Sequence, residues 1–173
     1  QANQLDITFF VPCYNEEKNV TKTLNTIISA VNKTKLSFEI VVVDDKSEDL
    51  TKEVVSKYID QNKSQNIILR ENQVNLGLGR GYIDTAFFSR GEHYMLVNGD
   101  NAEHEETLLK LLNEVGKSDM IIPYFGSNDK RHLMRVNLSK VFTLIINFIS
   151  GYNIKYYNGP VIHKRFNVMR WSP

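Results

Sequence analysis

The sequence predicts an α/β domain with a mostly parallel central sheet and helices on both of its faces. Short, almost continuously apolar runs recur along the chain, as expected for strands that are covered on both sides. Segments with apolar residues at helical spacing lie between them, and this alternation is typical of βαβ units. At 173 residues, with 42% hydrophobic and 24% charged residues, the chain is expected to form a single domain over residues 1–173.

The expected elements alternate in order along the chain. Strands are expected at five apolar runs, which are residues 5–11, 38–43, 67–69, 94–97 and 120–122. An amphipathic helix is expected after each of the first four runs. The first helix ends near Asn32, the second covers 48–59, the third runs through 86–88, and the fourth covers 104–115. We expect Asn15 to cap the first helix, because asparagine is favoured at that position.

The segment 136–149 is unusually apolar for a surface helix. Its apolar residues are interrupted by Lys140, Thr143 and Asn147, and it is too short to span a bilayer. Two interpretations stay open for it. One is packing in the core, and the other is a helix that lies at a membrane surface beside basic neighbours.

The net charge of +1 hides an asymmetry along the chain. From Asn128 onward there are eight Lys or Arg residues and one acidic residue, Asp129, whereas the preceding part is acidic overall. The first part therefore suits a metal ion, and the last part suits phosphates or an acidic membrane face, with a plain solvated surface as the alternative. No nucleic-acid partner is expected, because no binding motif for one is visible.

Other composition features point to a cytoplasmic protein. Cys13 is the one cysteine of the chain, so no intrachain disulfide can form, which suits a reducing compartment. No signal peptide is visible at the start, and the abrupt end at Pro173 suggests that C-terminal sequence is missing. Contact with the cytoplasmic face of a membrane is the open alternative, and the oligomeric state is not predicted.

Carboxylates occur in the loops after three of the expected strands. Glu16 follows the first strand, Asp44 and Asp45 follow the second, and Asp100 follows the fourth. Each could be a helix cap alone, but the carboxyl ends of parallel strands meet at one edge of a sheet, where ligands bind. Because a Mg²⁺ or Mn²⁺ ion on a diphosphate needs only one or two protein carboxylates, we expect Asp100 to hold such an ion.

The glycine-rich stretch 77–81 does not predict dinucleotide binding. That fingerprint follows the first strand and has a third glycine three residues after the second. This stretch follows the third expected strand, and its spacing differs. A tight turn that opens a helix explains these glycines.

Four short motifs occur in a characteristic order. They are VPCYNEE at 11–17, VDDKSEDLT at 43–51, NLGLG at 75–79 and NGD at 98–100. Together they resemble family 2 of the inverting nucleotide-sugar glycosyltransferases, which have the GT-A fold. Within that family, the chain is most similar to the dolichol-phosphate and polyprenyl-phosphate sugar transferases, enzymes of cell envelope biosynthesis.

The resemblance implies a GT-A type, Rossmann-like sandwich that transfers a sugar from a UDP- or GDP-sugar with inversion and with Mg²⁺ or Mn²⁺. It implies that Asp100 is the second acid of the metal motif and that Arg131 and Arg135 face the diphosphate and the acceptor. The nucleotide-binding residues that it implies are Pro12, Tyr14, Asn15, Glu16, Asp44, Asp45, Gly77, Asn98 and Gly99.

Two departures from the family pattern bear on the acceptor and the metal. Asn98 stands where the first acid of the metal motif is usual, and the loop 155–159 lacks the aspartate often found on the acceptor side. A sugar hydroxyl needs a general base, for which Asp129 or His163 would have to serve, whereas a phosphate is already ionised. We therefore expect a polyprenyl or dolichyl phosphate acceptor. A saccharide acceptor, or a binding module that has lost catalysis, remains the alternative.

Overall fold

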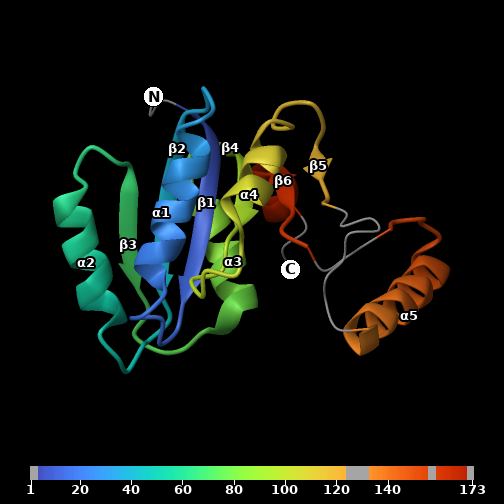
Figure 1. Cartoon of the computed structure of the whole chain (residues 1–173), viewed down its shortest axis with the longest axis horizontal. Helices are drawn as coiled ribbons and strands as arrows, with labels where there is room; N and C mark the ends of the chain where they lie inside the picture. Colours follow the sequence, from blue (N-terminus) through green and yellow to red (C-terminus); the bar gives the residue numbers. More distant parts are fainter. Residues whose placement is uncertain (1–3, 124–132, 156–158, 171–173) are drawn as a thin grey trace. The chain divides into compact units, whose positions relative to one another are not determined.

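The computed structural model describes residues 4–123, 133–155 and 159–170, except for the side chains of 133–136 (Figure 1). The chain divides into two compact units. The first comprises Gln1–Ile121 with Ile162–Pro173, and the second comprises Ile122–Val161. That the whole chain forms one domain stays a prediction.

The first unit is built on a six-stranded sheet with the strand order β3-β2-β1-β4-β6-β5. Its strands are β1 (Leu5–Cys13), β2 (Phe38–Asp44), β3 (Ile67–Glu71), β4 (Gly91–Leu96), β5 (Met120–Ile121) and β6 (Ile162–Lys164). The first four run parallel, whereas β6 pairs antiparallel with both β4 and β5. The predicted α/β class with a mostly parallel sheet is thus confirmed. β6 was not predicted, because three residues are too few to show a period.

Helices cover both faces of this sheet (Figure 1). One face carries α1 (Val20–Val31), α2 (Thr51–Gln61) and α4 (Glu105–Leu112), whose apolar residues join one large core cluster. The other face carries α3 (Gly77–Phe88) and α6 (Arg165–Arg170), which pack on a smaller cluster. Because both faces are covered, the central strands β1 and β2 are mostly apolar along their length.

Successive residues of β1 alternate between the two cores. Phe9 and Val11 belong to the larger cluster, and Phe10 belongs to the smaller one. The ring of Phe10 stacks on that of Tyr94 at a centroid distance of 6.2 Å. The Tyr94 hydroxyl donates a hydrogen bond to the carbonyl oxygen of Tyr82 at 2.8 Å, and burial raises the pKa of Tyr82 to about 12. The Tyr82 and Tyr94 side chains are therefore uncharged at physiological pH and contribute to the packing of this core.

The loops after the parallel strands contain three non-glycine residues with positive φ. They are Asn15 (φ 59°), Lys46 (φ 66°) and Asn101 (φ 58°). The predicted cap of the first helix is wrong, because α1 begins at Val20 after Asn19, and Asn15 is in the left-handed region that asparagine tolerates. The loops at this edge of the sheet therefore contain turns with a defined backbone conformation.

The order of the strands places a crevice at this edge. From β1 the chain passes to β2 and β3 on one side, and β4 then returns to the other side of β1. In open parallel sheets, ligands bind outside the carboxyl ends of the strands at such a point. The topology therefore leads to the loops that follow β1, β2 and β4.

The second unit contains α5 (Leu133–Ser150). The side-chain amide of Asn147 donates to the carbonyl oxygen of Ile154 at 2.9 Å, and its Oδ1 accepts from the Ile154 backbone N–H at 3.1 Å. Core packing does not hold for several apolar side chains of 136–149, because they are more than half exposed. No helix in the described part of the chain is long and apolar enough to cross a membrane.

Candidate functional site

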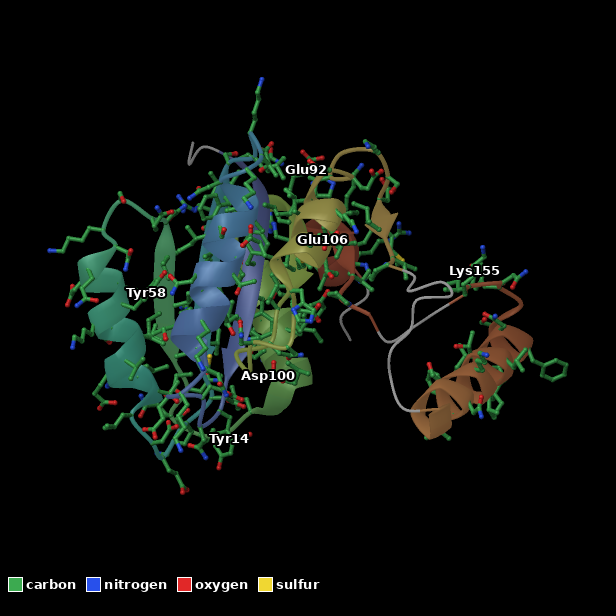
Figure 2. All side chains as sticks on the ribbon, in the orientation of Figure 1. Tyr14, Tyr58, Glu92, Asp100, Glu106 and Lys155 are labelled. Carbon is green, nitrogen blue, oxygen red and sulfur yellow. The ribbon has the colours of Figure 1, made fainter. Side chains whose placement is uncertain are left out.

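A cavity of about 240 Å³ lies at the carboxyl ends of β1 and β2. Figure 2 shows Tyr14 and Asp100 at this end of the sheet, with Glu92, near the start of β4, at the opposite end. The described residues that line it belong to β1 and β2, to the segments that follow β1, β2, β3 and β4, and to the first half of α3. They are Phe10, Pro12, Cys13, Tyr14, Glu16, Val43, Asp45, Asn72, Gly77, Leu78, Gly81, Asn98, Gly99 and Asp100.

Most of the residues expected at a nucleotide site from the sequence lie in this wall. Those that line the cavity are Pro12, Tyr14, Glu16, Asp45, Gly77, Asn98, Gly99 and Asp100. Asn15 and Asp44 are not among its lining residues, and the Asp44 carboxylate accepts a hydrogen bond from the Ser47 hydroxyl. Arg131 lies outside the described residues, as does the side chain of Arg135 on α5.

Asn15 joins the loop after β1 to the loop after β2. Its backbone N–H donates to Ser47 Oγ at 3.0 Å, and its side-chain oxygen accepts from the Glu48 backbone N–H at 2.8 Å. The next residue continues the contact, since the Glu16 N–H donates to Thr51 Oγ1 at 2.8 Å. Asn15 therefore holds the backbone that brings Glu16 to the cavity wall.

Asp45 joins the loop after β2 to the glycine-rich turn. Its Oδ1 accepts from the Asn72 side-chain amide at 2.7 Å and from the Leu76 N–H at 2.9 Å, and its Oδ2 accepts from the Gly77 N–H at 2.8 Å. Burial alone would raise the pKa of this carboxyl, but the three hydrogen bonds outweigh it and hold the pKa below its usual range. The ionised Asp45 therefore fastens the first turn of α3, where backbone N–H groups lack helical partners.

Gly99 holds the stretch after β4 against the end of β1. Its N–H donates to the carbonyl oxygen of Pro12 at 3.2 Å, and its own carbonyl oxygen accepts from Thr23 Oγ1 at 3.0 Å. A Cβ on Gly99 would stand 2.8 Å from Cys13 Sγ. Glycine is therefore needed here for the close approach of two backbones.

Asp100 follows this glycine and is exposed at the cavity. Its Oδ1 accepts from the Ala102 N–H at 3.0 Å. The nearby Glu103 has a raised pKa, because burial disfavours its charge and the Asp100 carboxylate adds repulsion. The carboxylates of Asp100 and Glu103 therefore give the segment after β4 a negative electrostatic potential, which favours a bound cation.

The donors at the cavity fit a divalent ion whose remaining ligands come from a bound molecule. Within the described ranges, no group of three or more His, Cys, Asp or Glu residues could hold a metal by itself. A Mg²⁺ ion usually keeps waters and takes one or two carboxylates together with substrate phosphates. Asp100 and Asn98, which both line the cavity, are the residues that would hold such an ion.

Six lining residues were not predicted from the sequence as part of the site, namely Phe10, Cys13, Val43, Asn72, Leu78 and Gly81. Asn72 directly follows β3, so the rule that sheet ends converge could have found it. Leu78 belongs to a stretch that reads only as a turn. Cys13 is the last residue of an apolar strand. Burial raises the pKa of its thiol, so the uncharged thiol forms part of the cavity wall.

Two curated relatives each match about two thirds of the chain. A dolichyl-phosphate β-glucosyltransferase of Dictyostelium discoideum is 29% identical over 122 residues, which is 66% of this chain and 37% of the relative. A poly(ribitol-phosphate) β-glucosyltransferase of Bacillus spizizenii is 31% identical over 110 residues, or 63% of this chain and 17% of the relative. The chain thus spans less than half the length of these relatives.

Solved structures and a family model match as well. The structure of S. aureus TarS 1–349 in complex with UDP has a TM-score of 0.59 at 28% identity, covering 74% of this chain and 38% of TarS. The mannosyltransferase PcManGT of Pyrobaculum calidifontis, solved with GDP-Man and Mn²⁺, has a TM-score of 0.71 at 17% identity, covering 98% and 47%. The latter likeness shows the GT-A fold. The model of glycosyl transferase family 2 matches residues 8–172, and the chain therefore belongs to that family.

Proposed function

We propose that the cavity binds the nucleotide of a UDP- or GDP-sugar, and that the chain is the donor-binding part of a glycosyltransferase. The observation that carries this proposal is the exposed Asp100 carboxylate in the wall of a 240 Å³ cavity at the carboxyl end of the sheet, in a chain of this family. Solved neighbours hold UDP, or GDP-Man with Mn²⁺, which supports both the donor class and the metal.

Three side chains of the cavity have distinct roles in this proposal. The half-exposed ring of Tyr14 offers an aromatic face on which a base can stack. Asp45 uses about three of its four acceptor positions within the chain, which leaves one for an N–H of the base. Asp100 would hold Mg²⁺ or Mn²⁺, which acts as a Lewis acid on the departing diphosphate.

We propose a polyprenyl or dolichyl phosphate as the acceptor, met at the cytoplasmic face of a membrane. An ionised phosphate oxygen attacks the anomeric carbon from the side opposite the nucleoside diphosphate. The new carbon–oxygen bond forms as the bond to the diphosphate breaks, so the configuration inverts and no base is required. Arg131 and Arg135 are proposed to neutralise these phosphates. The dolichyl-phosphate relative supports this acceptor.

Calorimetry paired with a turnover assay tests the proposal. UDP, GDP, UDP-glucose and GDP-mannose are titrated with and without Mn²⁺, and sugar transfer to polyprenyl phosphate is compared with transfer to free sugars. We expect Mn²⁺-dependent binding of one nucleotide class and transfer to the lipid phosphate. Transfer to free sugars alone would reject the lipid acceptor, and absence of nucleotide binding would reject the donor site.

A second candidate is a nucleotide-sugar-binding module without catalysis, and the neutral Asn98 favours it. Metal-dependent binding without turnover, even with lipid phosphate present, would select this alternative. Transfer to a saccharide or polyol polymer is a third outcome of the same assay. The poly(ribitol-phosphate) relative is the reason to include such a polymer among the acceptors.

A further inference from the structure

Helix α5 presents a broad apolar surface to solvent. Six of its large apolar side chains are 51–92% exposed. Their spacing of three and four residues places them on one side of the helix, and we name this surface the apolar arc. It consists of Leu138, Val141, Leu144, Ile145, Phe148 and Ile149.

The opposite side of α5 carries polar residues, two of which are buried or hydrogen-bonded. Thr143 is only 9% exposed, and Asn147 holds the backbone of Ile154 through two hydrogen bonds. A helix of a globular protein normally buries its apolar side and exposes its polar side. Because α5 does the reverse, its apolar arc is suited to a partner outside this unit.

The charge around α5 indicates which partner fits. The unit that contains α5, residues 122–161, has five Lys or Arg residues and one acidic residue, Asp129, in its sequence. An apolar helix side in a unit with a net positive charge is complementary to an anionic lipid surface. A second copy of this chain would bring the same positive charge against itself, which disfavours a dimer through this surface.

We propose that α5 lies flat on an anionic lipid bilayer, with the apolar arc inserted at the boundary between headgroups and acyl chains. Lys140 lies at the flank of the arc by helical spacing and is exposed, so its stem can reach along the helix while its ammonium group meets the headgroups. No described helix is apolar enough to cross a bilayer, and this fits a surface position. The proposal does not depend on the donor site, because lipid binding is measured without nucleotide.

Sedimentation of the 173-residue chain with vesicles tests this surface. Vesicles of phosphatidylcholine alone are compared with vesicles containing phosphatidylglycerol, at low and high salt. We expect stronger binding to the anionic vesicles and weaker binding at high salt. Phe148→Ser should lower the partition coefficient about tenfold, and Lys140→Gln should lower it about fivefold on anionic vesicles only.

A matched control is Phe87→Ser in α3. Phe87 is also a mostly exposed helical phenylalanine, 58% against 92% for Phe148, and its replacement should leave vesicle binding unchanged. Circular dichroism would verify that all variants remain folded. Equal binding by the wild-type protein and Phe148→Ser, or no vesicle binding by the wild-type protein, would overturn the proposal. A wild-type dimer that Phe148→Ser converts to a monomer would assign the arc to a second copy instead.

Discussion

Gly99 and Cys13 lie so close together that no side chain fits between them. A Cβ on Gly99 would stand 2.8 Å from Cys13 Sγ and 3.0 Å from the carbonyl oxygen of Pro12. Cys13 is itself almost fully buried, and the Pro12 carbonyl belongs to the backbone of β1. Neither atom can move away without disturbing the end of that strand. The position of Asp100 therefore depends on a glycine one residue earlier.

We predict that Gly99→Ala displaces the stretch after β4. Overpacking of this kind costs about 1–3 kcal/mol, and nucleotide binding should weaken at least about tenfold because the cavity wall moves. Calorimetry with UDP and GDP and urea denaturation measure the two effects. The control is Gly79→Ala, where a Cβ meets nothing within 4 Å and where alanine should stabilise the helix slightly. Wild-type nucleotide affinity in Gly99→Ala would contradict the prediction.

The metal assignment predicts opposite effects for two neighbouring substitutions. Asp100→Ala should abolish the Mn²⁺-dependent part of UDP or GDP binding. Asn98→Asp should tighten binding about tenfold in Mn²⁺, because a second carboxylate raises the affinity for a divalent ion. Without Mn²⁺ it should weaken binding, because the new charge repels the diphosphate. Calorimetry with and without Mn²⁺ separates these cases.

A control for this pair is Glu92→Gln at the opposite end of the sheet (Figure 2). It removes one negative charge, as Asp100→Ala does, but far from the cavity, so binding should not change. If Asp100→Ala and Glu92→Gln behave alike, this stretch is only a turn. If Asn98→Asp has no metal-dependent effect, Asn98 does not face the ion.

The sequence predicted the alternation of strands and helices, because each of these elements follows from a local pattern. The apolar runs at β1 and β2 read as buried strands, and the helices between them follow from their spacing. β6 could not be predicted, since its three residues carry no period and its place between β4 and β5 depends on chain far away in sequence. The sequence also left open whether the apolar side of α5 is buried or exposed. Periodicity shows that residues share one side of a helix, but it does not show whether another part of the protein covers that side.

The sequence also brought most of the cavity wall together, for a general reason. Parallel strands end at one edge, so Glu16, Asp45 and Asp100 had to converge whatever their detailed contacts. Their individual roles could not be predicted, because a hydrogen-bond partner is set by loop conformation. Asn15 is not the expected helix cap, and its hydrogen bonds join two loops to each other; that it also contacts a nucleotide stays a prediction.

The lowered pKa of Asp45 predicts a pH-dependent contribution to stability. Because the folded pKa lies below the ordinary value near 4, the ionised carboxylate stabilises the fold above that pH. The contribution disappears as the pH falls through the folded pKa. Asp45→Asn should therefore lower the free energy of unfolding by about 1–3 kcal/mol at pH 7, and the difference from the wild-type protein should shrink below about pH 4.

Urea denaturation at several pH values between 7 and 3 measures this effect. The control is Asp60→Asn, which replaces an exposed carboxylate in α2. It should leave the free energy of unfolding unchanged at every pH. A difference between Asp45→Asn and the wild-type protein that stays constant from pH 7 to pH 3 would mean that the charge of Asp45 is not what stabilises the turn.

A buried carboxylate at the other end of the sheet links three strands. Glu39 on β2 is 1% exposed. Its Oε1 accepts from the Thr8 hydroxyl at 2.8 Å and from the Arg90 backbone N–H at 2.6 Å, and its Oε2 accepts from Arg90 Nε at 2.8 Å. Arg90 directly precedes β4, while Thr8 is on β1. The carboxylate therefore fastens the starts of β2, β1 and β4 to one another.

We predict that Arg90→Ala destabilises the first unit far more than the loss of a surface ion pair does. Removing one partner of a buried pair costs about 3–5 kcal/mol. The Arg90 side chain is 40% exposed, and two neutral donors to Glu39 remain, so we expect about 2–3 kcal/mol. Lys110→Ala, which breaks the exposed pair with Glu106 in α4, is the control and should have no measurable effect. Denaturant unfolding measures the free energy of unfolding of both variants. If both variants lose the same free energy of unfolding, the burial of Glu39 does not make its ion pair with Arg90 stronger than an exposed pair.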